Sequence, residues 1–206
     1  MSTTATRRLT RHERRTLIER AATYLFARKG YAGTTVEDIV RAAGVTNPIL
    51  YRYYESKREL CIVLLERYRD ELAAAPLNQF VGGDGNPQQQ LTAMIAAWLG
   101  HIERDPDAAR LLLKPIVGDP EVERVQHELH VRQRAADTAL LREFVPHLSQ
   151  EDAEPLGEAT RGSLAAVALW WLDRLDRVPR EVPARALLAL CQGLLTNLTA
   201  DDRSGR

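Results

Sequence analysis

The fold is decided by residues 34–57, which read TTVEDIVRAAGVTNPILYRYYESK. Thr35 precedes two acidic residues, an order typical of a helix N-cap and of a first turn that suits the helix dipole. Apolar residues at helical spacing follow until Gly44, which can adopt the positive φ that a tight turn needs. A very short second helix is predicted from Thr46, with Pro48 in its first turn. A helix, a tight turn and a second helix form a helix-turn-helix.

The orientation of the short helix follows from the rotation of about 100° per residue. Leu50 and Tyr54 fall on the same side and continue the apolar face of the preceding helices, so we expect both to point into the core. The residues left for the outward face are Pro48, Ile49, Tyr51 and Arg52. An outward face of this kind is what enters the major groove of DNA.

The outward face carries groups that suit DNA. Arg52 can pair with O6 and N7 of guanine, and Pro48 or Ile49 can meet a thymine methyl group. Polar side chains around them suit phosphate oxygens, which fix the register of a protein on DNA. The predicted DNA-binding residues are Thr34, Thr35, Thr46, Asn47, Pro48, Ile49, Tyr51, Arg52, Tyr53 and Lys57. Further arginines that can contact an adjacent stretch of the DNA backbone or the DNA minor groove are Arg7, Arg8, Arg11, Arg14 and Arg15.

The charge distribution supports a nucleic-acid partner. The chain of 206 residues has 28 basic and 28 acidic side chains, but residues 1–60 hold 12 of the basic and only 6 of the acidic ones. A charge difference between segments is typical of a nucleic-acid-binding module. Helix-turn-helix geometry also occurs in ordinary bundles, and arginine-rich faces are often only solvated. The coincidence of motif and basic segment favours DNA binding.

The rest of the chain also shows helical spacing, without sustained alternation of period two. A first helix ends at Gly30, and a fourth starts after Ser56 and ends before Pro76. Later helices are predicted at 87–104, 106–114, 120–144, 153–176 and 183–199. The predicted fold is therefore all-α, with about nine helices. We divide it into a DNA-binding domain of residues 1–56 and a helical effector-binding and dimerisation domain of residues 57–206.

Residues 16–60 resemble the DNA-binding domain of TetR/AcrR transcriptional regulators. The matching positions are Ala21, Ala22, Leu25, Phe26, Gly30, Tyr31, Thr34, Thr35, Ile39, Ala43, Gly44, Val45, Leu50, Tyr51, Ser56 and Lys57. The chain has Asn47-Pro48 where members commonly have a small Ser or Gly, and Tyr53-Tyr54 where a His-Phe pair is usual. The resemblance implies a homodimeric repressor of a palindromic operator, which a small-molecule effector releases and which dimerises through its last two helices.

The last predicted helix is apolar almost all round, so we expect it to be buried, with another subunit as its cover. The predicted dimerisation residues are Trp171, Leu187, Leu190, Cys191, Leu194 and Leu198. An aromatic-lined cavity suits a largely apolar effector, for which the candidate residues are Met94, Trp98, His101 and Trp170. The same side chains also fit an ordinary core or subunit interface, and that alternative stays open.

The sequence contains little that suggests catalysis or metal chemistry. Glu123, His127 and His130 share a helix face, but the histidines lack the i, i+4 spacing of a zinc protease and no fourth ligand is suggested. A solvated face is the favoured interpretation. No nucleophile arrangement or phosphate-binding glycine loop is found. We therefore predict no enzyme activity, no cofactor and no metal.

The remaining features favour a cytoplasmic protein. The N-terminal residues show no secretory signal and no stretch is long and apolar enough to span a bilayer. Cys61 and Cys191 are predicted to be reduced and packed. Two alternatives to a ligand-responsive repressor remain. One is a small-molecule-binding or enzymatic bundle with a degenerate helix-turn-helix, and the other is a constitutive DNA binder without an effector.

Overall fold

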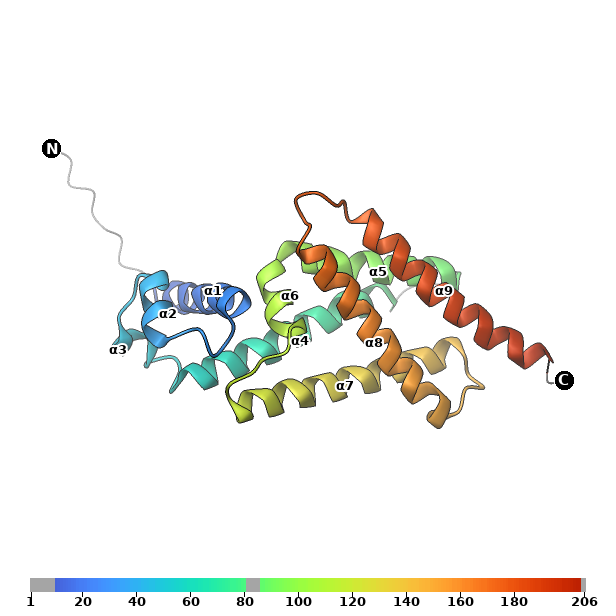
Figure 1. Ribbon diagram of the computed structural model, residues 1–206, viewed down its shortest axis with the longest axis horizontal. Coiled ribbons are helices and arrows are strands. Elements are labelled where there is room, and N and C mark those ends of the chain that lie inside the picture. Colours follow the sequence, from blue (N-terminus) through green and yellow to red (C-terminus); the bar gives the residue numbers. More distant parts are fainter. Residues whose placement is uncertain (1–9, 81–85, 205–206) are drawn as a thin grey trace.

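A computed structural model describes residues 10–80 and 86–204 and confirms the all-α prediction. Nine helices account for nearly all of this described part (Figure 1). They are α1 (Arg11–Lys29), α2 (Val36–Ala43), α3 (Asn47–Leu50), α4 (Lys57–Phe80), α5 (Pro87–Arg104), α6 (Pro106–Leu113), α7 (Pro120–Phe144), α8 (Gln150–Leu172) and α9 (Glu181–Ser204). Helices α1 to α3 lie at one end, and α4 runs from that end into the larger group formed by α5 to α9.

Local sequence signals set the ends of the first helices. Thr10 and Thr35 each form a capping box with the acid three residues later, so that side chains satisfy the first free amides of α1 and α2. Gly30 and Gly44 follow these helices with φ of 75° and 64°. Glycine tolerates this conformation without the steric cost that a Cβ adds, so the predicted turn at Gly44 is confirmed.

Several helix limits differ from the prediction. Pro76 lies inside α4, which continues to Phe80, so the predicted end before Pro76 is wrong. A proline removes one intrahelical hydrogen bond, and packing of α4 along α5 outweighs this loss. Helix α8 begins at Gln150 because the Ser149 side chain caps it. It ends at Leu172 rather than 176, whereas α9 extends to Ser204 rather than 199.

One apolar cluster joins the two ends of the molecule. It includes Ile18 of α1, Leu50 of α3 and Leu64 of α4, and it continues to Trp171 of α8 and Leu187 of α9. Helix α4 contributes to the cluster along much of its length, and its first turns pack on α1. The division into domains at residue 56 stays a prediction, because this core runs across it.

Helices α7 and α8 approach closely where Gly157 faces Thr138. A Cβ added at Gly157 would lie 2.3 Å from Thr138 Oγ1 and 3.2 Å from Thr138 N. We expect Gly157→Ala to cost about 2 kcal/mol of unfolding free energy, because overpacking forces helices apart. Urea unfolding measures this cost. The Thr138→Ala background removes the nearest atom and should shrink the cost, and an equal cost there would contradict the proposed clash.

Candidate nucleic-acid interface and effector cavity

The helix-turn-helix orients α3 as the periodicity predicts. Leu50 and Tyr54 are buried, at 0% and 3% exposure. Pro48, Tyr51 and Arg52 are exposed, and Tyr51 retains 51% of its accessible surface. The expected inward side is confirmed, and Pro48, Tyr51 and Arg52 lie outward as expected. Ile49, which was also expected outward, is half-buried and packs against the core.

A buried carboxylate beneath α3 fixes its position. Glu19 of α1 accepts hydrogen bonds from the Tyr54 hydroxyl and from Arg15 Nε. Its second oxygen accepts from Arg67 Nη1 of α4. Tyr54 follows α3 directly, so this network joins α1, α3 and α4. Sequence reasoning missed it, although an acid between the buried Ile18 and Ala22 is a signal that could have revealed it.

The protonation of this network follows from its contacts. Burial raises the pKa of Glu19, but hydrogen bonds from Tyr54, Arg67 and Arg15 outweigh burial and hold the pKa below its ordinary value. Burial and the hydrogen bond to Glu19 raise the pKa of Tyr54 to about 12. At neutral pH the carboxylate is therefore charged and the phenol is neutral, which suits a stable donor–acceptor pair.

Several predicted DNA-binding side chains use their polar atoms within the chain. Lys57 Nζ donates to the carbonyl oxygens of Tyr31 and Thr34 at 2.9 and 2.8 Å, and it lies 4.0 Å from the Tyr31 ring centroid. Thr34 is buried and its hydroxyl donates to Gly30 O at 2.8 Å. Tyr53 Oη donates to the carbonyl of the first residue of α1 at 2.9 Å. These residues position the α2–α3 unit.

Three arginines gather beside the exposed face of α3. Arg11 and Arg15 of α1 line one cleft together with Arg52, and His12 completes its basic wall. The cleft has a volume of about 500 Å³. Like charges held together repel one another, and an anion such as a phosphate oxygen relieves that repulsion. The location of Arg52 therefore favours a phosphate contact over the guanine contact expected from the sequence.

Ion pairs connect this end to the larger group of helices. Asp119 caps α7, accepts a hydrogen bond from Tyr31 Oη at 3.0 Å and pairs with Arg58 of α4 at 3.0 Å. Arg28 of α1 pairs with Asp107 of α6 at 3.2 Å. Burial raises the pKa of Asp119, but Arg58 and Tyr31 outweigh it and lower the pKa overall. A movement of α6 or α7 is thus coupled to α1 and α4.

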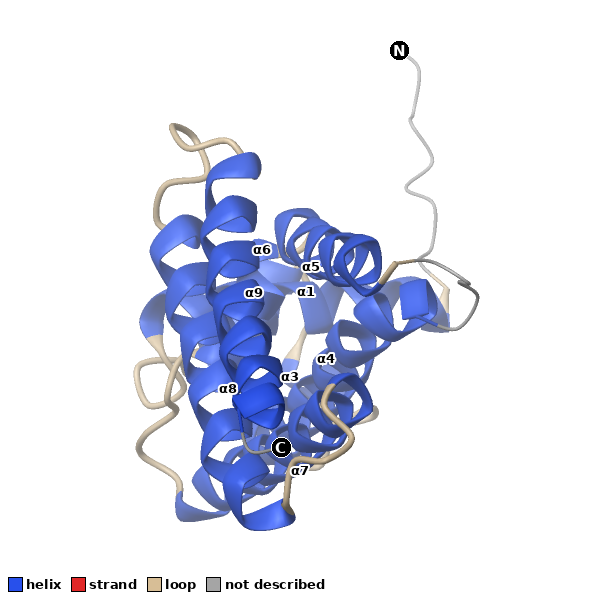
Figure 2. Cartoon of the chain, turned by 90° about the vertical axis from the view of Figure 1, so that its right-hand side faces the viewer, coloured by secondary structure: helices blue, strands red, loops and turns tan. Residues whose placement is uncertain are grey.

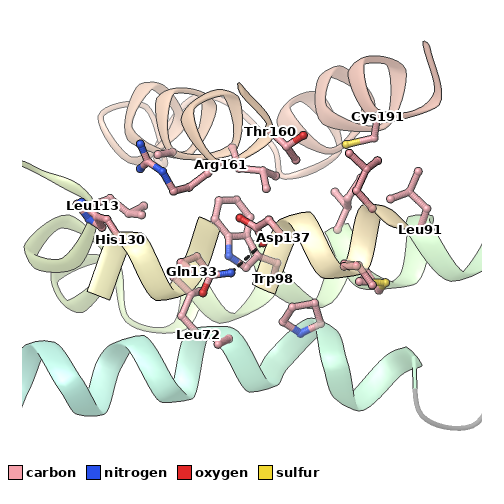
Figure 3. A pocket seen from close by; sticks show the side chains of 18 of the residues that line it. Leu72, Leu91, Trp98, Leu113, His130, Gln133, Asp137, Thr160, Arg161 and Cys191 are labelled. Atoms are coloured by element: carbon pink, nitrogen blue, oxygen red, sulfur yellow. Dashed lines mark hydrogen bonds between the residues drawn. The ribbon is translucent and has the colours of Figure 1, made fainter. Parts of the chain in front are cut away.

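A second cavity lies between α4, α5, α6, α7, α8 and α9 (Figure 3). Its volume is about 200 Å³ and most of its wall is apolar. Met94 and Trp98 line it, as expected for effector-binding residues, whereas His101 and Trp170 are not among its lining residues. The polar side chains in its wall are Arg69, His130, Gln133, Asp137, Thr160 and Arg161.

The titratable groups of this cavity have shifted pKa values. Burial raises the pKa of Asp137 to about 6, and the Gln133 amide donates to its carboxylate at 2.9 Å. Burial lowers the pKa of His130, and Arg161 lowers it further. Burial also raises the pKa of the Cys191 thiol, which therefore stays protonated at neutral pH. The cavity thus combines one weakly stabilised carboxylate with neutral groups and arginines.

The predicted dimerisation residues lie in several environments. Trp171 and Leu187 are buried inside the chain, at 0% and 1% exposure. Cys191 and Leu194 line the cavity, and Leu198 packs on a small cluster around Leu141. Leu190 is 53% exposed. Trp170, which was expected in the effector site, is 42% exposed. Leu190 and Trp170 are therefore the large apolar side chains that α9 and α8 present to solvent.

Two further features concern metals and membranes. Among the side chains of residues 10–76 and 88–198, no three His, Cys, Asp or Glu groups come together to hold a metal ion. Within the same ranges, no helix is both long enough and apolar enough to cross a membrane.

Comparisons with known proteins agree with this architecture. Residues 18–63 match the family described as "Bacterial regulatory proteins, tetR family". The chain is 34% identical over 116 residues to the HTH-type transcriptional activator FasR of Mycolicibacterium smegmatis. This match covers 56% of this chain and 52% of FasR. It is 36% identical over 87 residues to the HTH-type transcriptional repressor KstR2 of Mycobacterium tuberculosis, covering 42% of each. The chain thus matches about half the length of these curated relatives, or less.

Similarity of fold extends over nearly the whole chain. A TetR-like transcriptional regulator from Rhodococcus sp. RHA1 superposes with a TM-score of 0.73 at 24% identity, covering 91% of this chain and 98% of that structure. The family match covers residues 18–63, which contain the helix-turn-helix, and the fold match extends over 91% of the chain. These relatives are transcriptional regulators and not enzymes. The chain is therefore similar to the TetR family of transcriptional regulators in the sequence of its helix-turn-helix, over residues 18–63, and in its overall fold.

Proposed function

We propose that this chain is a cytoplasmic, ligand-responsive repressor that binds a palindromic operator as a homodimer. One observation carries the proposal: a core-anchored α3 exposes Pro48, Tyr51 and Arg52 next to a cluster of arginines. In this arrangement α3 enters the major groove, where Pro48 and Tyr51 meet base edges. Arg11, Arg15 and Arg52 hold the flanking phosphates, which set the register.

The phosphate role of Arg52 has a measurable signature. Arg52→Ala should lower the affinity for every DNA sequence and reduce the slope of log affinity against log salt by about one, because one fewer counterion is released. Fluorescence anisotropy at several salt concentrations measures both. Arg132→Ala, an exposed arginine of α7, serves as the charge-matched control. A loss confined to one operator position would instead assign Arg52 to base reading.

The outer faces of α8 and α9 form the proposed dimer interface. These helices lie side by side at the end of the molecule away from α1 to α3, as Figure 2 shows from that end. Trp170 and Leu190 are exposed on these helices, and a Cβ added at Gly162 of α8 or Gly193 of α9 would meet no atom within 4 Å. Two copies can therefore approach closely, as in a four-helix bundle. The dimer presents two α3 helices to half-sites about 34 Å apart, or a multiple of that spacing.

Effector binding acts through α4 and α7. Helix α4 starts at Lys57, which holds the loop before α2, and it lines the cavity with Leu72. Helix α7 starts after Asp119, which is bonded to Tyr31 and Arg58, and it lines the cavity with Asp137. A ligand that separates these helices therefore changes the orientation of α1 to α3 and the distance between the two α3 helices.

Selection of bound fragments from random DNA tests the proposal. We expect enrichment of one sequence with two inverted half-sites. No enrichment would favour a small-molecule-binding or enzymatic bundle with a degenerate helix-turn-helix. Enriched DNA that no small molecule releases, in a screen that scores both thermal stabilisation and release, would favour a constitutive DNA binder.

A further inference from the structure

We propose that the cavity selects an organic cation, an apolar body that carries a protonated amine, with Asp137 as its counter-ion. This inference rests on the proposed role of the cavity as the effector site and specifies its ligand. Asp137 projects from α7 into the pocket in Figure 3, where the dashed line marks its bond to Gln133.

The carboxylate of Asp137 has no ion-pair partner among the side chains that the structure describes. Among the described residues that line the cavity it is the one acid. Its hydrogen bond comes from the neutral amide of Gln133. Arg161 of α8 lies near enough to lower its pKa, but no basic side chain of residues 10–76 and 88–198 forms an ion pair with it. Burying a charge is costly unless the charge is paired, so the site favours a ligand that supplies a cation.

The arginines of the wall already have acidic partners. Arg161 pairs with Glu158 of the same helix, with Nε 3.1 Å from Oε2. Arg69 pairs with its neighbour Asp70, which leaves its buried Nε as a hydrogen-bond donor without a partner. A ligand carboxylate would compete with Glu158 or Asp70 and would add a second anion to the cavity of Asp137. The charge pattern therefore favours a cation at Asp137, and the anionic probe below tests whether an apolar anion binds the arginines instead.

The apolar wall also suits a cation with a hydrophobic body. Trp98 and Phe144 contribute aromatic rings, whose faces attract cations, and leucine side chains supply most of the remaining surface. Burial raises the pKa of Asp137 to about 6, because the surrounding protein stabilises this charge poorly. An ammonium group beside the carboxylate removes this penalty on binding.

The test uses three probes that share an octyl chain and differ in the head group. Octylamine is cationic at pH 7.5, 1-octanol is neutral and octanoate is anionic. Calorimetric titration of the full chain should give a Kd for octylamine at least about 10-fold below that of 1-octanol, which corresponds to one desolvated ion pair. Octanoate should bind most weakly. All three are used below their micelle concentrations.

The variant Asp137→Asn isolates the carboxylate. We expect it to lose the preference for octylamine, with a rise of about 10-fold in that Kd, and to keep the Kd of 1-octanol within about 2-fold. We also expect a higher Tm at pH 7.5, because the substitution removes an unpaired buried charge. A lower Tm would identify misfolding and separate it from a loss of binding. Glu143→Gln, an exposed acid on the same helix outside the cavity, is the matched control and should change neither Kd nor Tm.

Each remaining outcome overturns the inference. Tighter binding of octanoate would assign the site to a carboxylate ligand. Equal binding of octylamine and 1-octanol, an unchanged preference in Asp137→Asn, or no binding of any probe would remove the role of Asp137. The proposed function fails separately: an octylamine preference without any DNA selected from the random pool contradicts the repressor but leaves the ligand class standing.

Discussion

Leu190→Glu is expected to convert the protein into monomers and to lower its affinity for the selected operator by at least about 100-fold. Leu190 is 53% exposed on α9, near Gly193, where an added Cβ would meet no atom within 4 Å. In a symmetric interface each subunit contributes one of the new carboxylates, and both carboxylates lose their contact with water when the dimer forms. Loss of the dimer also removes the gain from binding two half-sites at once, which is worth about 100-fold or more.

Sedimentation velocity and fluorescence anisotropy with the selected operator measure the two effects. Val131→Glu is the matched control, because Val131 is a comparably exposed apolar residue of α7 away from the outer faces of α8 and α9. That variant should remain dimeric with wild-type affinity. An intact Leu190→Glu dimer would assign the interface to another surface.

Glu19→Gln should destabilise the protein by about 3 kcal/mol at pH 7. The substitution removes the charge that pairs with Arg15 and Arg67 and leaves Arg67, which is partly buried, without its closest acid. Breaking a partly buried pair by removing one partner typically costs about 3–5 kcal/mol, and solvent access to both arginines places the expected cost at the low end. Urea unfolding measures this cost, and Glu37→Gln, an exposed acid of α2, should cost below about 1 kcal/mol.

The pH dependence of this difference has a fixed sign. The pKa of Glu19 is lower in the folded chain than its ordinary value of 4.5. Its stabilising contribution is therefore fully present above pH 4.5 and disappears as the pH falls through the folded pKa. The gap between wild type and Glu19→Gln should shrink below pH 4.5. A gap that stays constant into acid would show that Glu19 stabilises by packing rather than by charge.

The helix-turn-helix could be predicted because its signals are local. The burial of Leu50 and Tyr54 follows from helical rotation within a few residues, and the turn at Gly44 follows from one conformational requirement. The limits of α4 could not be predicted, because Pro76 opposes the helix locally and packing on α5 overrides it. Local preference decides a helix end only where tertiary contacts do not oppose it.

Side chains that face more than one neighbour were harder to place. Helical rotation shows that Trp170 and Trp171 cannot face the same way, but only the packing of α8 buries Trp171 and exposes Trp170. Lys57 was expected on phosphate because it is basic and follows the motif, whereas its ammonium group lies over Tyr31 and binds two backbone carbonyls. Such contacts join residues far apart in sequence, so no local pattern contains them.

Hydrogen exchange with and without the selected operator tests the docking surface most directly. We expect slower exchange in the first turn of α1, at the start of α2 and throughout α3 and Tyr51–Tyr53, with little change on the outer faces of α8 and α9. Protection confined to α5–α9, or no protection in α3, would contradict the claim that this chain binds DNA through its helix-turn-helix.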